Sequence, residues 1–186
     1  MADFQVWLVR SIAAMKLTAP IMYSKWGWPA CESLHFIGLS LLVGMIGAFD
    51  LRLLGVAKRI PIAALHRFVP FGVAGFLINV VTGAMFLLTE PDQYIFNVSF
   101  HVKLLFLAMA GLNVLVFYSF VYRRVKHLPP GADAPRAAKM AAAVSLGCWI
   151  GVIICGRLLT FYRPFECPPE GPGVIADCLP QRGQIK

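Results

Sequence analysis

Long runs of apolar residues, separated by short polar segments, dominate this chain. A helix needs about 20 mostly apolar residues to cross the hydrocarbon core of a bilayer, and strands are much shorter than these runs. The pattern therefore predicts four transmembrane helices, at about residues 29–54, 68–88, 96–121 and 137–161. Because the loops between them are short, we expect an all-α integral membrane four-helix bundle, with residues 1–186 forming a single membrane domain.

Two flanking segments, residues 1–28 and 162–186, lie outside the four predicted spans. In the first, apolar side chains recur at helical spacing: Phe4, Trp7, Leu8 and Ile12. This pattern favours an N-terminal interfacial helix that lies on the membrane surface, and a loosely ordered segment is the alternative. The second segment is rich in proline and glycine and has no helix or strand pattern, which indicates an irregular C-terminal tail.

Basic residues are distributed unevenly among the predicted loops. The first and third loops carry most of them: Arg52, Lys58, Arg59, Arg67, Arg123, Arg124, Lys126, Arg136 and Lys139. The second loop has Glu90 and Asp92 but no lysine or arginine. The positive-inside rule then places the first and third loops in the cytoplasm, and both termini outside a bacterial inner membrane. We therefore assign the net charge of +8 to topology and lipid headgroups, and expect no nucleic-acid partner.

The cysteines divide between a span and the external tail. Cys148 and Cys155 lie within the fourth span, where cysteine usually serves as a small packing residue. Cys167 and Cys178 lie in the tail, and an irregular tail in an oxidising compartment gains order from a crosslink. We expect a Cys167–Cys178 disulfide, with Cys31, near the outer surface, as a competing partner. A link to another subunit and metal binding by two thiolates are the alternatives.

Two histidines, His35 and His101, lie inside predicted spans, where an ionisable side chain indicates a functional site. From the helical rise per residue, they lie about 9 Å and about 8 Å below the outer boundary. Two imidazoles on one haem iron hold their nitrogens about 4 Å apart, twice a typical metal–imidazole bond, so their depths must match. The two histidines meet this requirement and predict one b-type haem with His35 and His101 as axial ligands.

Three charged residues near this pair could act on a haem or its ligands. Arg157, near the outer end of the fourth span, is the best partner for an anionic propionate because guanidinium binds carboxylates bidentately. Lys103 lies about 200° around the helix from His101, so it either reaches a propionate along the flank or extends to lipid headgroups. Glu32 either orients the imidazole of His35 or is a solvated carboxylate at a helix start.

Glycines and isolated polar residues also occur within the predicted spans. The glycines are Gly38, Gly44, Gly47, Gly72, Gly75, Gly83, Gly147, Gly151 and Gly156. Such small residues leave room for a flat macrocycle, but they serve plain helix packing equally well. We expect the side chains of Asn79, Thr82 and Asn113 to form hydrogen bonds between helices.

His66 and His127 form a second pair, at the predicted cytoplasmic interface beside Arg67 and Lys126. We interpret them as interfacial histidines in basic loops. The alternative is a second haem, which would let electrons cross the bilayer in two hops.

Two short motifs carry a family resemblance. Leu34-His35 near the start of the first span and the His101–Leu104 segment (HVKL) resemble motifs of HemJ-type protoporphyrinogen oxidases and CopD-like bacterial membrane proteins. The resemblance covers roughly residues 30–125. In the first group the cofactor is a b-haem held by paired histidines, which implies that His35 and His101 are axial ligands and that Lys103 matches the lysine of the HVKL motif. The N-terminal segment and the cysteine-bearing tail are additions to that pattern, and they resemble docking elements for an external partner.

The preferred interpretation is a haem b electron-transfer subunit, which is a component of an oxidoreductase. It would link a periplasmic redox protein or other membrane subunits to the quinone pool. One alternative is a HemJ-like protoporphyrinogen oxidase with a substrate role for Lys103. Another is a non-redox accessory subunit of a larger membrane complex, whose histidines bind a pigment or nothing. Copper handling has little support because the methionines form no cluster, and no nucleotide loop or HExxH motif occurs.

Overall fold

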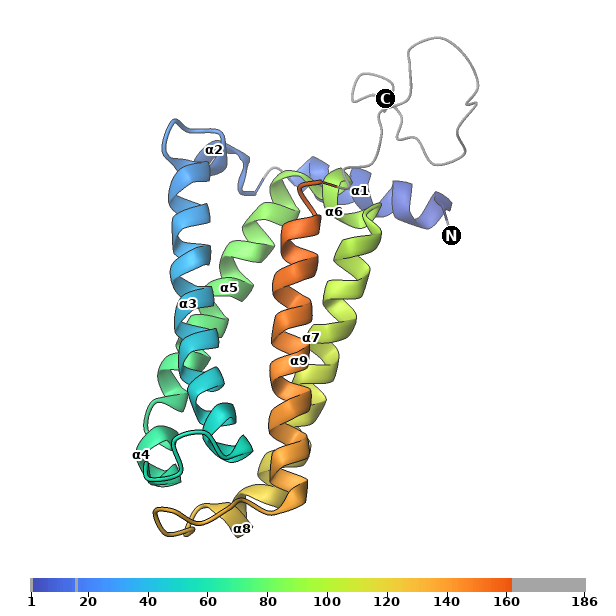
Figure 1. The fold of residues 1–186 in the computed structure, drawn as a ribbon. Helices are drawn as coiled ribbons and strands as arrows, with labels where there is room; N and C mark the ends of the chain where they lie inside the picture. The colour runs from blue at the N-terminus through green and yellow to red at the C-terminus, as the bar shows by residue number, and fades with distance from the viewer. Residues whose placement is uncertain (1, 16, 162–186) are drawn as a thin grey trace.

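The computed structural model describes residues 2–15 and 17–161, and this part of the chain is built from helices without a strand. Four long helices run side by side (Figure 1): α3 (Gly27–Leu54), α5 (Val69–Thr89), α7 (Val98–Val116) and α9 (Arg136–Leu158). Each of the four spans is long and apolar enough to cross a membrane. The predicted all-α four-helix membrane bundle is therefore confirmed, and its helices begin and end within a few residues of the predicted spans.

The outward faces of the four helices are apolar and exposed. Even in the most buried of the four spans, which contains α9, only 39% of the most apolar 18-residue stretch is buried within the described part of the chain. Large exposed side chains include Phe36 of α3, Phe76 of α5, Leu112 of α7 and Ile150 of α9. Water-soluble monomers rarely expose apolar surface on this scale, so these faces suit the hydrocarbon of a bilayer.

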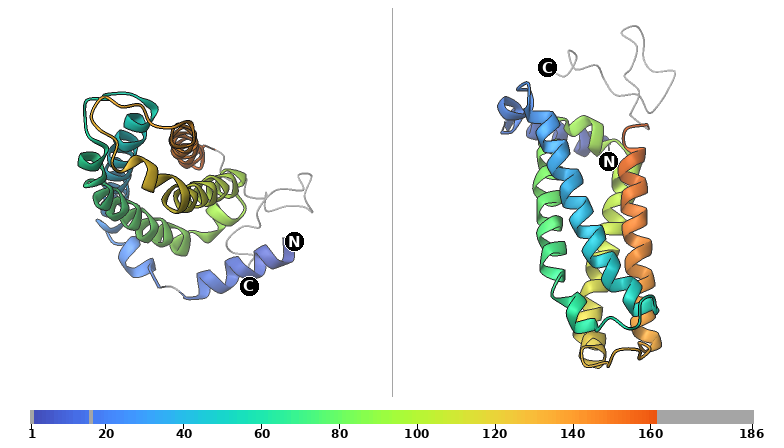
Figure 2. Two further views of the ribbon diagram at one scale, coloured as in Figure 1. Left: turned by 90° about the horizontal axis from the view of Figure 1, so that it is seen from below. Right: turned by 60° about the vertical axis from the view of Figure 1, so that its left-hand side comes forward.

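The bundle consists of two helical hairpins. α5 packs along α3, α7 packs along α9, and α3 joins the two hairpins through α9 (Figures 1 and 2). Within the described part of the chain, α5 and α7 hardly touch each other. The closest approach is between α3 and α5, where a Cβ atom on Gly75 would lie 2.5 Å from the carbonyl oxygen of Gly38. Glycine at this crossing lets the two backbones meet.

Short helices close the two ends of the bundle. At one end, called here the α6 end, α6 (Pro91–Ile95) joins α5 to α7. There α1 (Ala2–Met15) lies across the helix ends, and α2 (Ala19–Met22) connects it to α3 (Figure 2). At the opposite α4 end, α4 (Ile62–His66) precedes α5, and α8 (Tyr122–Val125) ends the third span.

α1 lies crosswise to the spans, as expected of an interfacial helix. It packs on α6 and α5, where Gln5 donates a hydrogen bond to the carbonyl of Ile95 at 3.5 Å, and Val9 is buried. Phe4 and Trp7 are exposed instead, and their rings stack at 5.9 Å. Part of the predicted apolar face is therefore free to contact lipid rather than the bundle.

Local sequence explains where two of the spans begin and end. α3 stops at Gly55, which adopts a φ of 107°, and its backbone N–H bonds to the carbonyl of Arg52 at 3.2 Å. Glycine reaches this left-handed conformation without a steric penalty. α7 starts after Asn97, whose side chain accepts a hydrogen bond from the backbone N–H of Ser99 at 2.9 Å. Asparagine is among the preferred residues at this capping position.

The third span contains a π turn, η1 (Phe117–Val121), which the apolar pattern does not predict. In a regular α-helix, side chains four positions apart drift by about 40° around the axis. The wider turn offsets that drift, so Phe117, Val121 and Val125 all reach one buried cluster with Phe49 of α3. Because α8 then continues the helix, the third span extends to Val125, beyond the predicted end at residue 121.

Arg52 is not a loop residue, although the charge pattern counts it with the first loop. It lies in the last turn of α3, and only 1% of it is exposed. Its Nε donates to the carbonyl of Ile60 at 2.6 Å, and its Nη2 donates to the carbonyl of Ala132 at 3.4 Å. One buried side chain therefore holds both loops of the α4 end against the bundle.

A surface cluster joins the same two loops and the start of α9. The carboxylate of Asp133 binds Lys58 at 2.9 Å and Lys139 at 3.2 Å. The backbone N–H of Gly131 also donates to the carbonyl of Lys58 at 2.8 Å. Hydrogen bonds from the two lysines lower the pKa of Asp133 below its ordinary value.

Candidate functional site

His35 lies on α3 and faces α5, where it is half-buried. Its Nδ1 is 2.7 Å from the hydroxyl of Thr82, and that hydroxyl is 2.7 Å from the carbonyl oxygen of Ile78. A carbonyl oxygen can only accept, so the single hydroxyl hydrogen of Thr82 is donated to Ile78. Nδ1 of His35 must therefore donate its own hydrogen to the hydroxyl oxygen of Thr82. The neutral imidazole then carries a free electron pair on Nε2, which can ligate a metal.

His101, in the first turn of α7, is also held through its Nδ1 atom, but by a backbone carbonyl instead of a side-chain hydroxyl. Its Nδ1 lies 2.9 Å from the backbone carbonyl of Asn97, which can only accept. In the neutral form of a ring held in this way, Nδ1 carries the hydrogen and Nε2 carries the electron pair that can ligate a metal. Metal-ligating histidines almost always donate their second ring N–H to a carbonyl, a carboxylate or water. Both histidines thus have the tautomer that ligation through Nε2 requires.

The two imidazoles lie on different helices, His35 on α3 and His101 on α7. Neither a hydrogen bond nor a ring contact joins them in the described part of the chain; His35 packs on Phe86 at 5.7 Å, and His101 packs on Phe100 at 6.2 Å. His101 is exposed, and Lys103, about 200° further around α7, packs towards α9. His101 therefore faces away from α9.

Lys103 is the more buried of the two predicted cations. It is half-buried, its Nζ lies 3.9 Å from the position of a Cβ atom on Gly156, and its charge acts on His35. Arg157 is exposed, with its guanidinium over the ring of Phe161 at 5.2 Å. Lys103 is therefore the inner and Arg157 the outer candidate partner for an anionic group.

Glu32 does not have the orienting contact that was one expectation for it. Its side chain is exposed, and Thr82 is the residue that holds Nδ1 of His35.

The glycines of the spans serve two purposes. Four pack tightly against a neighbouring helix: Gly38, Gly72, Gly75 and Gly151. At Gly83, by contrast, a Cβ atom would have His35 as its nearest neighbour, with Cε1 at 3.8 Å. Gly156 has the same relation to Lys103. Packing explains the first group, whereas the second leaves space beside the two side chains of the site.

Two of the three polar residues within the spans form the expected hydrogen bonds between helices. Thr82 contacts His35 of α3, and Asn113 of α7 donates to the carbonyl of Ala141 of α9 at 3.0 Å. The prediction was wrong for Asn79, which donates to the carbonyl of Gly75 in its own helix at 2.9 Å.

The second histidine pair is separated in the structure. His66 lies in α4, with Nε2 3.1 Å from the hydroxyl of Tyr118 and its ring stacked on Tyr122 at 4.6 Å. His127 is exposed after α8, and no contact joins it to His66 among the described residues. His66 thus belongs to an aromatic cluster that also includes Phe49.

The cysteines of the described part are free and buried: Cys31, Cys148 and Cys155. The thiol of Cys31 lies 3.7 Å from the carbonyl of Thr82, so it is enclosed by the bundle rather than presented at its surface. The predicted disulfide partners Cys167 and Cys178 lie outside the described residues, as does the C-terminal tail. Within the described ranges, no group of three or more metal-ligating side chains occurs.

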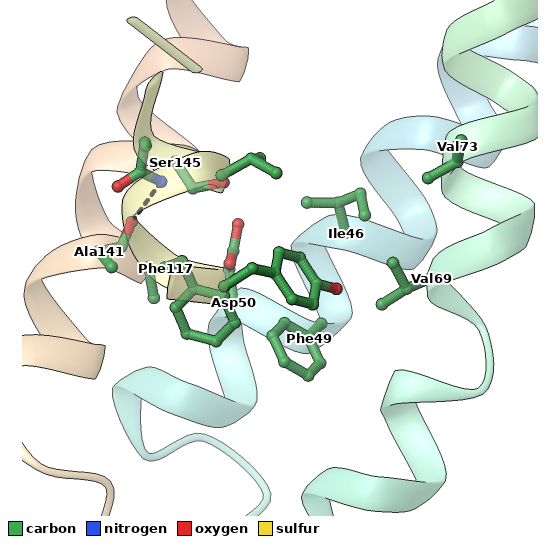
Figure 3. A pocket seen from close by; sticks show the side chains of 12 residues that line it. Ile46, Phe49, Asp50, Val69, Val73, Phe117, Ala141 and Ser145 are labelled. Carbon is green, nitrogen blue, oxygen red and sulfur yellow. Dashed lines mark hydrogen bonds between the residues drawn. The ribbon is translucent and has the colours of Figure 1, made fainter. Parts of the chain in front are cut away.

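Sequence reasoning missed Asp50 as a candidate site residue. Asp50 lies in α3 and is 5% exposed, and it lines a cavity of about 260 Å³ in the half of the bundle near the α4 end (Figure 3). The signal was available, because the predicted first span ran to residue 54 and therefore contained this carboxyl.

The fold and the apolar surface define the class of this protein, a multi-pass, all-α membrane protein with four apolar helices. Comparison with known proteins gives no match to a family model, a characterised protein or a solved structure. The resemblance to HemJ-type and CopD-like proteins therefore stays a prediction from two short motifs.

Proposed function

We propose that the protein is a b-type haem electron-transfer subunit of the membrane, with His35 and His101 as the ligands to iron. The observation that carries the proposal is the shared tautomer: each Nδ1 donates to a fixed oxygen, of Thr82 or of Asn97, and each Nε2 is left free. Ligation through Nε2 with Nδ1 held by a protein oxygen is the usual arrangement of a metal-bound histidine.

The residues around His35 support the same proposal. Gly83 and Gly156 leave space beside His35 and Lys103. Lys103 and Arg157 can pair with propionates, and the haem would supply the one-electron chemistry. His101 is exposed and His35 is half-buried, so a haem between them would cover the exposed ring.

The same proposal includes an orientation of the bundle in the membrane. The α4 end carries nine lysines and arginines, whereas the connection between α5 and α7 carries none, and the positive-inside rule assigns the more basic loops to the cytoplasm of a bacterial inner membrane. The α6 end, with α1 across it, then faces outside, where a redox protein could dock. Electrons would pass between that partner and the quinone pool of the membrane.

The test is a dithionite-reduced minus oxidised spectrum of the detergent-purified full chain, with a pyridine haemochrome count. We expect b-type bands at one haem per chain, and loss of these bands in His35→Ala and in His101→Ala. His127→Ala, an exposed histidine in a loop, is the matched control and should keep the full haem content. Circular dichroism and size-exclusion profiles show whether each variant is folded. Full haem content in both folded ligand variants, or no haem in the wild type, would overturn the proposal.

One observation favours a second candidate, the porphyrinogen oxidase. The ammonium of Lys103 lies within the bundle, where its charge acts on His35 and where it could hold a propionate of a substrate instead of a cofactor. A porphyrinogen oxidation assay with the purified protein separates the two candidates, because the electron-transfer subunit should show no turnover.

A further inference from the structure

The cavity of about 260 Å³ lies between all four spans in the half of the bundle near the α4 end. Figure 3 shows that α3, α5, η1 and α9 contribute to its wall. Most of the lining is apolar, and three rings contribute to it: Phe49, Phe117 and Tyr118. A dry cavity of about 150 Å³ is large enough to bind benzene. This cavity therefore has room for one six-membered ring with substituents.

Polar groups also contribute to the lining of the cavity. Asp50 points from α3 into the cavity towards Ser145 of α9 (Figure 3), and the Ser145 side chain is within hydrogen-bonding reach of the carboxyl. Asn113 also lines the cavity, next to its hydrogen bond with the carbonyl of Ala141. A ring that enters the cavity therefore meets these three polar side chains together, and the hydroxyl of Tyr118, which contacts His66, is a further polar group of the lining.

The two oxygens of the Asp50 carboxyl differ in their partners. Asp50 is 5% exposed, and its Oδ2 atom has no hydrogen-bond partner within the part of the chain that the structure describes. Buried polar atoms in folded proteins are nearly always hydrogen-bonded, since leaving one without a partner is costly. A carboxyl oxygen aimed into a ring-sized cavity is suited to accept a hydrogen bond from a ligand.

The cavity opens towards lipid. Its rim includes Val73 of α5 and Val114 of α7, which are 49% and 44% exposed, and these two helices hardly touch each other in the described part. The opening lies within the apolar spans, so a ligand that enters by this route must dissolve in the bilayer. The π turn η1 forms one wall, and π turns are frequent at functional sites.

We propose that this cavity binds the head group of a membrane quinol, with a ring hydroxyl donating a hydrogen bond to Oδ2 of Asp50 and the isoprenoid tail leaving between α5 and α7. The choice of a quinol among lipid-soluble rings with hydroxyl groups rests on the proposed electron-transfer function. The cavity, the unpartnered carboxyl and the lipid-facing opening do not depend on it.

The experiment uses the full chain in lipid nanodiscs and a short-tailed benzoquinone as the probe. Quinone rings quench nearby indole fluorescence, and Trp149 is buried one turn beyond Ser145 on α9. We expect saturable quenching, and Trp149→Phe identifies the signal of this residue. The reduced quinol is then added as a competitor. It should displace the quinone, and so restore the fluorescence, at concentrations below the dissociation constant of the quinone, because the quinol has hydroxyl groups that can donate to Asp50 and the quinone has none.

Two variants test the site: one changes the hydrogen-bonding group, and the other blocks the opening. Asp50→Asn keeps the shape but loses the carboxylate, so it should weaken quinol binding about tenfold or more and remove the preference for quinol over quinone. Val73→Phe fills the opening without touching Asp50 and should abolish saturable quenching. Val80→Phe, two turns along the same helix and outside the cavity lining, is the matched control and should bind normally.

Two outcomes overturn the inference: no saturable quenching in the wild type, or unchanged binding in both Val73→Phe and Asp50→Asn. Either would mean that lipid or water alone fills the cavity. If Asp50→Asn fails to fold, the contrast between the two valine variants still decides the result. Haem spectra are recorded on the same samples. Quinol binding without haem contradicts only the proposed electron transfer, and haem without quinol binding contradicts only this inference.

Discussion

The site of His35 and the group around Asp50 differ in how their buried polar side chains are paired. Near the α6 end, His35 and Thr82 are joined by a hydrogen bond that fixes which ring nitrogen carries the proton. Near the α4 end, Asp50 and Arg52 are more deeply buried, yet Oδ2 of one and Nη1 of the other have no partner among the described residues. A satisfied group has its orientation fixed before a ligand arrives, whereas an unsatisfied group marks a place where a ligand can supply the missing partner.

The largest effect is expected from Gly75→Leu, which should disrupt both halves. A Cβ atom there would lie 2.5 Å from the carbonyl oxygen of Gly38 and 2.8 Å from the backbone nitrogen of Leu42, and backbone cannot move aside as a side chain can. Overpacking costs about 1–3 kcal/mol where neighbours can shift, and we expect the upper end or more here.

The measurement for Gly75→Leu is thermal unfolding in detergent together with haem content. Gly44→Leu, on a face of α3 where a Cβ atom would meet nothing within 4 Å, is the control and should be neutral. Equal stability of the two variants would show that α3 and α5 do not cross as described.

Arg52→Met should come second, and it should affect only the half near the α4 end. The substitution removes the hydrogen bonds to the carbonyls of Ile60 and Ala132. A hydrogen bond to a charged group contributes about 1.5–3 kcal/mol. We expect a lower unfolding temperature and faster proteolysis in residues 126–135, with the haem spectrum unchanged. Arg59→Met, an exposed arginine of the first loop, should leave both measurements as they are.

Thr82→Val addresses the other half alone. The valine keeps the shape but leaves Nδ1 of His35 without its partner, so the imidazole loses its fixed tautomer. Removing such a supporting contact typically lowers affinity for the metal centre about 10–100-fold. Haem titration of the apoprotein measures this loss, and Thr82→Ser should restore most of the affinity. Haem affinity that is equal in valine and serine variants would contradict the role given to Thr82.

The smallest effect concerns the surface cluster around Asp133. Its lysine partners lower the pKa of this carboxyl, so the cluster stabilises the folded state above the ordinary carboxyl pKa of about 4, and this stabilisation is lost as the pH falls through the lowered value. Asp133→Asn should therefore unfold at a slightly lower temperature than the wild type at neutral pH, with no difference in strong acid. High salt should also reduce the difference, since the cluster is exposed. If the difference in unfolding temperature persists in strong acid, it arises from packing and not from the ionised carboxylate of Asp133.

Sequence reasoning predicted what depends on local pattern and missed what depends on contacts between distant segments. The ends of the spans follow from apolar runs, Gly55 and Asn97, so they could be predicted closely. The direction of His101 depends on which face of α7 meets α9, and no local signal gives that. The burial of Arg52 depends on a carbonyl of the far loop at Ala132, which is distant in sequence.

The hydrogen bond of Asn79 likewise depends on its surroundings in the folded bundle. Its position within a span correctly indicated a hydrogen bond, but the nearest acceptor turned out to be a carbonyl of its own helix. The π turn of η1 could not be predicted either, because it arises from the shared core that Phe117, Val121 and Val125 form with Phe49.

The joining of the two hairpins through α3 and α9 has a consequence for biosynthesis. Two of the partners of α3, Ser145 for Asp50 and Ala132 as the second acceptor for Arg52, follow the first hairpin in the sequence and leave the ribosome after it. An ionisable side chain within a membrane helix is costly, so Asp50 lacks its α9 partner until the fourth span inserts. A chain truncated before α9 would leave this carboxyl without Ser145, and membrane quality-control proteases could distinguish such a chain from the full-length protein.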